Sequence, residues 1–339
     1  MKKLFIMLMA ALPAALFPNF VHADEITLTT SKAVGDTIEL SFFGTEFSGI
    51  TVEGAAFDKK RDEGAGGGFC RGYYILESQT VKVSGNFTFI DCIGDSLTAL
   101  DVSKCTGLNA LYCDQNSLTA LDLSKCTQLG SLSCGSNSLT DLDVSKCTQL
   151  EHLFCEKNSL TALDVGKCTQ LQYLLCHENS LTALDVSKCT KLGVLFCGSN
   201  SLTDLDVSKC TELVELCCHK NLIKGKSMDD LIASLPDRNG LEYASPFEVY
   251  DLTVSGEQNI CTTLQVEAAR KRGWDPMAWN GQRWEEYPGS DPTGIDKTEI
   301  IIDTDNVAIY DLEGRRHRQY RPGINIVKTT DGKTVKVMR

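Results

Sequence analysis

The stretch Leu150-Glu-His-Leu-Phe-Cys-Glu-Lys-Asn-Ser-Leu-Thr-Ala-Leu-Asp-Val-Gly-Lys-Cys-Thr-Gln170 decides the fold, because it recurs with a period of 21 residues. The six complete copies begin at Phe87, Leu108, Leu129, Leu150, Leu171 and Leu192, and a seventh begins at Leu213 and ends after Ile223. A strict period of this length is typical of stacked units, none of which can bury its apolar face alone. The sequence therefore predicts a solenoid, and solenoids usually bind other molecules rather than transform them.

The cysteines follow the same period and are predicted to be buried free thiols. Thirteen of the 16 fall in two columns: Cys105, Cys126, Cys147, Cys168, Cys189 and Cys210, and Cys92, Cys113, Cys134, Cys155, Cys176, Cys197 and Cys218. Metal sites place such ligands two to four residues apart, whereas the nearest regular spacing here is eight, so we expect no metal and no cofactor. Disulfides remain an alternative, although stacked side chains point the same way. Cys70, Cys217 and Cys261 lie outside both columns.

The common pattern, L-x-x-L-x-C-x-x-N-S-L-T-x-L-D-V-S-K-C-T-x, resembles a leucine-rich repeat with cysteine at the last strand leucine. Within that family it is most similar to the short-repeat class typified by internalin J, whose repeats carry a cysteine ladder, and to surface proteins of Bacteroidetes. The resemblance implies an α/β-type repeat. It predicts a leucine-rich repeat solenoid of 21-residue units, with short parallel strands on the concave face and little helix on the convex face.

Two further columns of the repeat have structural interpretations. The amides of Asn116, Asn137, Asn158, Asn179, Asn200 and Asn221 are expected to satisfy backbone groups in the turn that leaves each strand, with Asp95 at the same place in the first repeat. The aspartates from Asp101 to Asp206 and the lysines from Lys104 to Lys209 lie three positions apart in each repeat. We expect these charges to neutralise each other on the outer face.

The segments around the repeats predict the domain organisation. The expected parts are a signal peptide (1–23), an N-terminal β-rich cap (24–86), the repeats (87–223), an α+β C-terminal cap (224–287), a linker (288–297) and a C-terminal β segment (298–339). Strand-like pieces cover Asp36–Phe43, Ile50–Ala56 and Tyr73–Val83. Helices are expected from Ser227 to Leu235, where Pro236 stops the first, and from Cys261 to Arg272.

The two ends of the chain suggest export. Lys2 and Lys3, an apolar run and Val21-His22-Ala23 predict cleavage between Ala23 and Asp24, and hence a secreted or outer-cell-surface protein. Ile309-Tyr-Asp-Leu-Glu-Gly-Arg-Arg316 and the stretch from Pro322 to Lys333, within about the last forty residues, resemble the C-terminal sorting domain of the type IX secretion system. No other stretch is apolar enough to be a transmembrane segment. Loss of the two lysines changes the net charge from −12 to −14, which disfavours nucleic acid and anionic lipid as partners.

The concave face is the candidate binding site. Leucine and cysteine at positions 4 and 6 of each repeat point inward, so positions 3, 5 and 7 must point outward. The candidate binding residues are Tyr112, His152, Phe154, Tyr173, Leu175, Val194, Phe196, Glu156 and His177. Asp114, Glu156, His177 and His219 are expected to form a polar rim. An open alternative is that the rings merely cover each other.

These residues predict binding rather than catalysis. The serines, histidines and aspartates almost all occupy repeat positions, so no catalytic group stands out, and we expect no enzyme. Glu156 and His177 are equivalent positions of adjacent repeats, but two ligands do not make a metal site. The favoured function is an adhesin-like module that recognises a protein or glycan on a host or bacterial surface. The alternative is a structural component of a surface layer or biofilm without a discrete ligand.

Overall fold

The computed structural model describes residues 24–43, 50–60, 69–240, 245–255, 257–290, 308–310, 316–317, 324–328 and 334–338. The predicted signal peptide and most of the predicted linker lie outside these residues. The chain divides into two units, Met1–Pro288 and Gly289–Arg339. In the second unit, β18 (Ala308–Tyr310), β19 (Arg316–His317), β20 (Ile324–Lys328) and β21 (Thr334–Met338) pair antiparallel in the order β19-β18-β20-β21.

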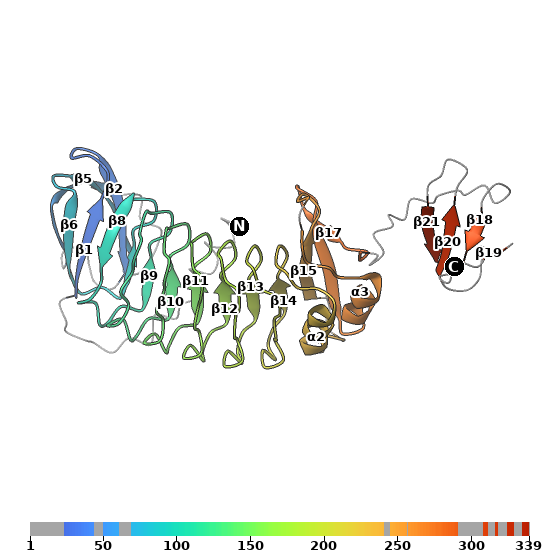
Figure 1. Ribbon diagram of the computed structural model, residues 1–339. Helices are drawn as coiled ribbons and strands as arrows, with labels where there is room; N and C mark the ends of the chain where they lie inside the picture. Colours follow the sequence, from blue (N-terminus) through green and yellow to red (C-terminus); the bar gives the residue numbers. More distant parts are fainter. Residues whose placement is uncertain are drawn as a thin grey trace. The chain divides into compact units, whose positions relative to one another are not determined.

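A row of three-residue parallel strands forms the centre of the first unit (Figure 1). The strands are β9 (Ala110–Tyr112), β10 (Ser131–Ser133), β11 (His152–Phe154), β12 (Tyr173–Leu175), β13 (Val194–Phe196) and β14 (Glu215–Cys217). Each residue pairs with its equivalent in the next repeat, as Leu132 does with Leu153 and Leu153 with Leu174. β7 (Phe89–Asp91) pairs parallel to β9 and starts the row. The repeats form a leucine-rich repeat solenoid.

The repeat core is built from the leucines and cysteines of the pattern. The central strand residue, for instance Leu111, Leu132 or Leu153, is fully buried in every repeat. The second cysteine of most repeats lies near a carbonyl of the preceding repeat, as Cys189 Sγ does 3.7 Å from Val165 O, whereas Cys105 Sγ lies near Glu25 O. All cysteines whose side chains the structure describes, from Cys92 to Cys261, are buried and free. Burial raises the pKa of these thiols, to about 12 for Cys126.

The asparagine column ties each turn to its neighbours. Asn158 Oδ1 accepts a hydrogen bond from Leu139 N–H at 2.9 Å, while Asn158 Nδ2 donates to the carbonyls of Cys134 and Cys155 at 3.0 and 3.2 Å. The same pattern continues beyond the repeats at Asn259, which accepts from Ile223 N–H at 2.9 Å and donates to Cys218 O at 2.8 Å. The column therefore extends one step into the C-terminal part of the unit.

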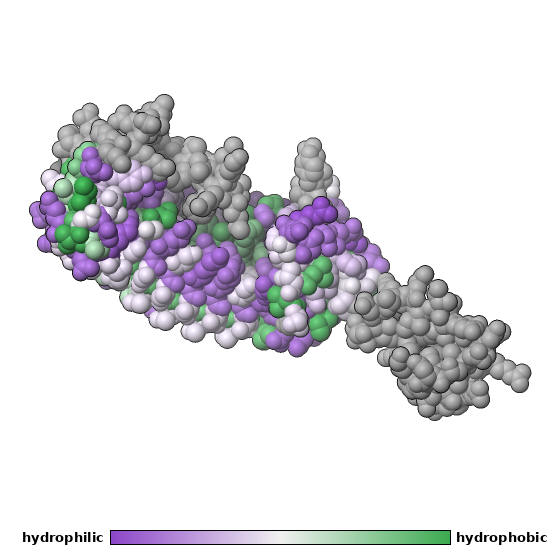
Figure 2. All heavy atoms as spheres, turned by 90° about the horizontal axis from the view of Figure 1, so that it is seen from above, coloured by the Kyte–Doolittle hydropathy of each residue, from purple (hydrophilic) through white to green (hydrophobic). Residues whose placement is uncertain are grey.

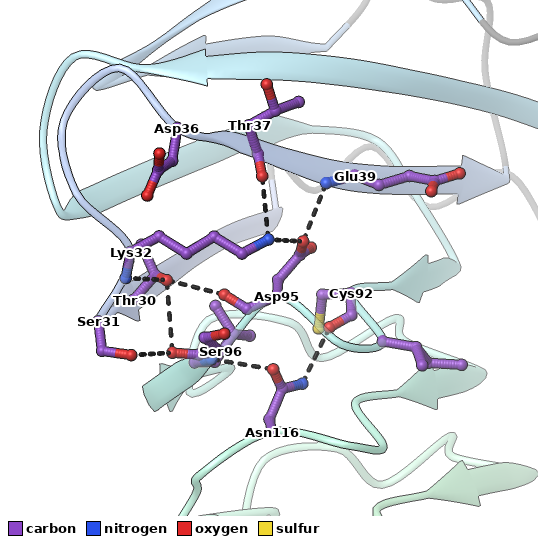
Figure 3. A network of polar contacts seen from close by, with 12 residues as sticks. Thr30, Ser31, Lys32, Asp36, Thr37, Glu39, Cys92, Asp95, Ser96 and Asn116 are labelled. Atoms are coloured by element: carbon purple, nitrogen blue, oxygen red, sulfur yellow. Dashed lines mark hydrogen bonds and ion pairs between the residues drawn. The ribbon is translucent and has the colours of Figure 1, made fainter.

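At the N-terminal end, Asp95 replaces asparagine and a lysine compensates its charge (Figure 3). Asp95 Oδ1 accepts hydrogen bonds from Lys32 Nζ at 3.1 Å and from Glu39 N–H at 3.0 Å. Thr30 Oγ1 also donates to Asp95 O at 2.7 Å. These contacts attach the first repeat to the N-terminal sheets.

The N-terminal strands extend one sheet and form another. β2 (Thr37–Phe43), β5 (Phe69–Leu76) and β4 (Ala55–Lys60) continue the row beyond β7, so that sheet has 13 strands. β3 (Thr51–Glu53), β6 (Thr80–Gly85), β1 (Asp24–Thr30) and β8 (Leu97–Asp101) form a four-stranded sheet. The sequence predicted one strand over Tyr73–Val83, but a turn separates β5 from β6 there. It did not predict β1 or the pairing of β1 with β8 of the first repeat.

At the other end, the row continues through β15 (Ser245–Asp251), β16 (Trp274–Trp279) and β17 (Trp284–Glu286), as Figure 1 shows. The two predicted helices are confirmed as α2 (Lys226–Ser234) and α3 (Thr263–Arg270). Thr262 and Gln265 form a capping box at the start of α3. Within the described part of the chain, no helix has the length and apolar character needed to cross a membrane.

The aspartates of the outer column are held by the backbone of their own turns. Each side chain accepts a hydrogen bond from the backbone two residues on, as Asp143 Oδ1 does from Ser145 N–H at 2.8 Å and Asp185 Oδ1 from Ser187 N–H at 2.8 Å. These bonds hold the pKa of Asp143 and Asp185 below the usual value. The lysine charges act on these carboxylates more weakly, as Lys188 does on Asp185. An aspartate reaches that amide without ordering a second side chain, whereas a surface ion pair must order a long lysine.

Candidate binding face on the strands

The parallel strands β9 to β14 position the candidate residues on one face. The concave face is defined here as positions 3, 5 and 7 of the repeats. The turn after each strand has a positive φ at position 8, for instance 55° at Lys157, where Lys157 N–H donates to His177 O of the next repeat at 3.0 Å. Because this bond recurs from turn to turn, the position 7 residues form a column beside the strands.

Rings of adjacent repeats contact one another along this face. His152 stacks on Tyr173 with ring centroids 5.1 Å apart and an interplanar angle of 27°. His177 meets Phe196 edge-on at 6.4 Å. At the C-terminal end, His219 meets Trp284 of β17 at 5.1 Å, so the row of rings continues past the last repeat. Trp284 could not be predicted from the repeat pattern, because β17 lies outside the repeat period.

The structure places all nine candidate residues on this face. Phe154 and Tyr112 are buried, whereas His152, Tyr173, Leu175, Val194, Phe196, Glu156 and His177 are half-buried. Leu153 and Cys155 belong to the main core cluster, while Phe154 between them does not. Tyr112 packs on Phe89 at 5.1 Å, and its hydroxyl lies 3.2 Å from Ser131 Oγ. At Tyr112, therefore, ring packing within the protein accounts for the aromatic residue.

The position 7 side chains differ in burial. Asp114 is 6% exposed, and its Oδ1 accepts hydrogen bonds from Ser133 Oγ at 2.7 Å and from Gly135 N–H at 2.9 Å. Glu156, His177 and His219 are half-buried. Burial raises the pKa of Asp114 to about 6 and that of Glu156 to about 7. The polar rim stays a prediction.

Histidine at this column stays uncharged near neutral pH. Burial lowers the pKa of His177, and it lowers the pKa of His219 to about 4. The imidazole of His219 contacts the thiol of Cys217, with Nδ1 3.1 Å from Sγ. Burial also raises the pKa of Cys217, so this thiol is not an activated nucleophile.

The chemistry of the face fits binding. Among the described residues, no three histidine, cysteine, aspartate or glutamate side chains are grouped to hold a metal ion. Positions 3, 5 and 7 of the seven repeats contain no lysine or arginine. They contain four acidic residues, Asp91, Asp114, Glu156 and Glu215. Arg71 pairs with Asp91 at 3.3 Å. The face is therefore acidic and aromatic.

Large exposed apolar side chains lie mostly outside the repeats. Among the described residues they are Val34, Phe57, Ile75, Val214, Leu252, Val254, Ile260 and Leu264, of which only Val214 is in the repeats. Figure 2 shows the repeats, on the side seen there, as mainly hydrophilic and intermediate in hydropathy, with hydrophobic clusters toward both ends of the first unit.

Comparison with known proteins gives structural matches only. No model of a known family matches the sequence, and no curated protein does. The functional domain of InlJ from Listeria monocytogenes, which includes a cysteine ladder, is similar at 30% identity over 58% of this chain and 50% of that chain, with a TM-score of 0.40.

Two other solved structures are also similar to this chain. An internalin (inlF) from the same organism is 22% identical over 52% of this chain and 50% of that chain, with a TM-score of 0.43. A leucine-rich repeat protein of Leptospira interrogans is 20% identical over 50% of this chain and 43% of that chain, with a TM-score of 0.39. This chain spans about half the length of the solved chains it matches.

Proposed function

We propose that this protein is a secreted or cell-surface binding protein that recognises a partner protein through the concave face. One observation carries the proposal: Phe154, Tyr173 and Phe196 lie together on the strands but outside the core cluster of the repeats. Aromatic side chains near the centre of an interface often contribute most of its binding energy. We expect each of the three to contribute about 2 kcal/mol or more to the affinity.

Export supports a surface role for this face. Residues 1–23 have the composition of a signal peptide, and the C-terminal segment resembles a sorting domain. Deletion of Ile309–Arg339 is expected to retain the protein in the periplasm if that segment is read. Unchanged delivery would show that export does not use it.

The test is capture of surface proteins by the purified protein and by two triple variants. In the first, Phe154, Tyr173 and Phe196 are changed to serine. In the second, the exposed lysines Lys146, Lys167 and Lys188 of the convex side are changed to alanine. Proteins captured by the parent and by the lysine variant, but not by the aromatic variant, would support the proposal.

Circular dichroism must show that the aromatic variant is folded. Undiminished capture by that folded variant would exclude the concave face as the site. Parallel assays with glycan arrays and with analytical ultracentrifugation separate the other outcomes, since a glycan receptor would bind sugars and a structural surface protein would self-associate.

A further inference from the structure

We propose that Asp114 and Glu156, on either side of Gly135, form a pocket that receives one lysine or arginine side chain of the partner protein. This inference rests on the proposed function, because the pocket lies on the concave face. It adds the charge of the group that the partner must insert there.

Three consecutive repeats build the pocket. Asp114, Gly135 and Glu156 occupy position 7 in the repeats of β9, β10 and β11. A Cβ atom on Gly135 would lie 2.7 Å from Glu156 Oε1 and 3.1 Å from Asp114 Oδ1. Both carboxyl groups therefore reach over the glycine from opposite sides, and the missing side chain is what allows them to converge.

Each carboxyl group has one oxygen without a partner. Asp114 Oδ2 and Glu156 Oε2 are buried atoms with no hydrogen-bond partner, and the whole Asp114 residue is 6% exposed. A buried carboxylate oxygen that is left unpaired is costly, so such atoms are expected to find a donor when the site is filled.

No positive charge of the described residues pairs with the two carboxyl groups. Lys157, next to Glu156 in the chain, forms an ion pair with Glu178 at 3.6 Å. Burial raises the pKa of both pocket carboxyl groups; the like charge of Asp91 adds to this effect at Asp114, and that of Glu178 at Glu156, where Lys157 opposes it. A cation from outside would oppose the effect at both groups.

The surroundings favour a basic side chain over a metal ion. Tyr112 and Phe154 end β9 and β11, and Asp114 and Glu156 follow them two residues later. An aliphatic lysine or arginine stem can lie along apolar rings while its charged end reaches the carboxyl groups. A metal ion would require further ligands, and no third histidine, cysteine, aspartate or glutamate of the described residues completes such a group.

The experiment titrates the purified protein, carrying ¹³C-labelled Asp and Glu carboxyl groups, with three blocked tripeptides. Their central residues are lysine, arginine and the neutral isostere norleucine. Asp114→Asn and Glu156→Gln assign the two carboxyl signals. The expected result is a saturable shift of both signals with the lysine or arginine peptide and none with the norleucine peptide.

A pair of glycine variants provides the matched control. Gly135→Ala places a Cβ against both carboxyl groups and is expected to weaken peptide binding at least about tenfold. Gly198→Ala occupies the same repeat position, but there the added Cβ meets the His219 ring, so binding should be unchanged. Equal shifts with norleucine, no shift with any peptide, or a saturable shift with calcium chloride alone would each overturn the pocket.

The experiments distinguish failure of the pocket from failure of the proposed function. If partner capture is lost in the aromatic triple variant but unchanged in Asp114→Asn/Glu156→Gln, the pocket is wrong and the proposed function stands. If capture survives in both folded variants, the concave face itself is excluded.

Discussion

On the convex side of the repeats, the same residue makes the same hydrogen bond in one unit after another, whereas on the concave side neighbouring units differ. Asp143 and Asp185 each accept from the amide two residues on. By contrast, position 5 of the concave face changes at every step: Tyr112, Ser133, Phe154, Leu175, Phe196 and Cys217.

This difference separates the residues that build the solenoid from those available for binding. The buried leucines, the thiols and the asparagine column complete the core and most of the turns, and positions 3, 5 and 7 add to them only locally, as Asp114 does with Ser133 and Gly135. The concave residues can therefore vary from unit to unit without loss of the fold. That freedom is what a binding surface needs.

The largest expected effect concerns the thiols of the two cysteine columns. Because they are buried and have raised pKa values, alkylation of the folded protein should be at least about a thousandfold slower than in denaturant. After denaturation without reductant, mass spectrometry should find most of the column cysteines labelled. If most are instead oxidised, the thiols are disulfide-bonded and their role as apolar core groups is wrong.

The next effect concerns the asparagine column. Asn158→Ala leaves Leu139 N–H and the carbonyls of Cys134 and Cys155 without their side-chain partner, so we expect a loss of about 2–3 kcal/mol in the free energy of unfolding. Urea denaturation measures it. The control is Asn109→Ala, whose amide makes one long contact of 3.4 Å to Gln128 O and should matter little. Equal effects of the two changes would contradict a structural role of the column.

A smaller effect of opposite sign is expected on the concave face. Asp114→Asn/Glu156→Gln removes two uncompensated charges and should stabilise the protein by about 1–2 kcal/mol at pH 8. A carboxyl group whose pKa is higher in the folded than in the unfolded state stabilises the fold at low pH, and this contribution is lost as the pH rises through the folded value.

The pH window follows from the pKa values. The unfolded values are about 3.9 for Asp and 4.3 for Glu. The folded values are about 6 for Asp114 and about 7 for Glu156, so their contribution to stability should fall between about pH 4 and pH 7. Asp95 and Glu248, with folded pKa values of about 6 and 7, are unchanged in the double variant. Between about pH 4 and pH 7, the free energy of unfolding should therefore change less with pH in the variant than in the parent protein. Equal changes in the two proteins would contradict the account.

The smallest expected effect is a change in melting temperature caused by a substitution on the convex side. Asp185→Ala removes one turn hydrogen bond, to Ser187 N–H, on an exposed surface, and should lower the melting temperature by roughly 1–3 °C. Lys188→Ala removes the lysine three residues on and should change the melting temperature less. A larger effect at Lys188 would show that charge neutralisation outweighs the turn hydrogen bond.

Sequence reasoning succeeded where the structure depends on the repeat and failed where it depends on distant pairing. The alternation at positions 4 to 6 predicts a short strand there, and the structure has it one residue earlier, at positions 3 to 5, with the leucine at position 4 buried. The pairing of Thr27 with Asp101, and the role of Asn259, join segments that share no period. The burial of Asp114 depends on the glycine in the next repeat, which only a three-dimensional neighbour relation shows.

The most direct test of the central claim measures stability and binding in the same two triple variants. Changing Phe154, Tyr173 and Phe196 to serine should abolish partner capture while the protein remains cooperatively folded. Changing Lys146, Lys167 and Lys188 to alanine should alter neither property. Capture that persists in the folded aromatic variant, or is lost in the lysine variant, would contradict the assignment of binding to the concave face.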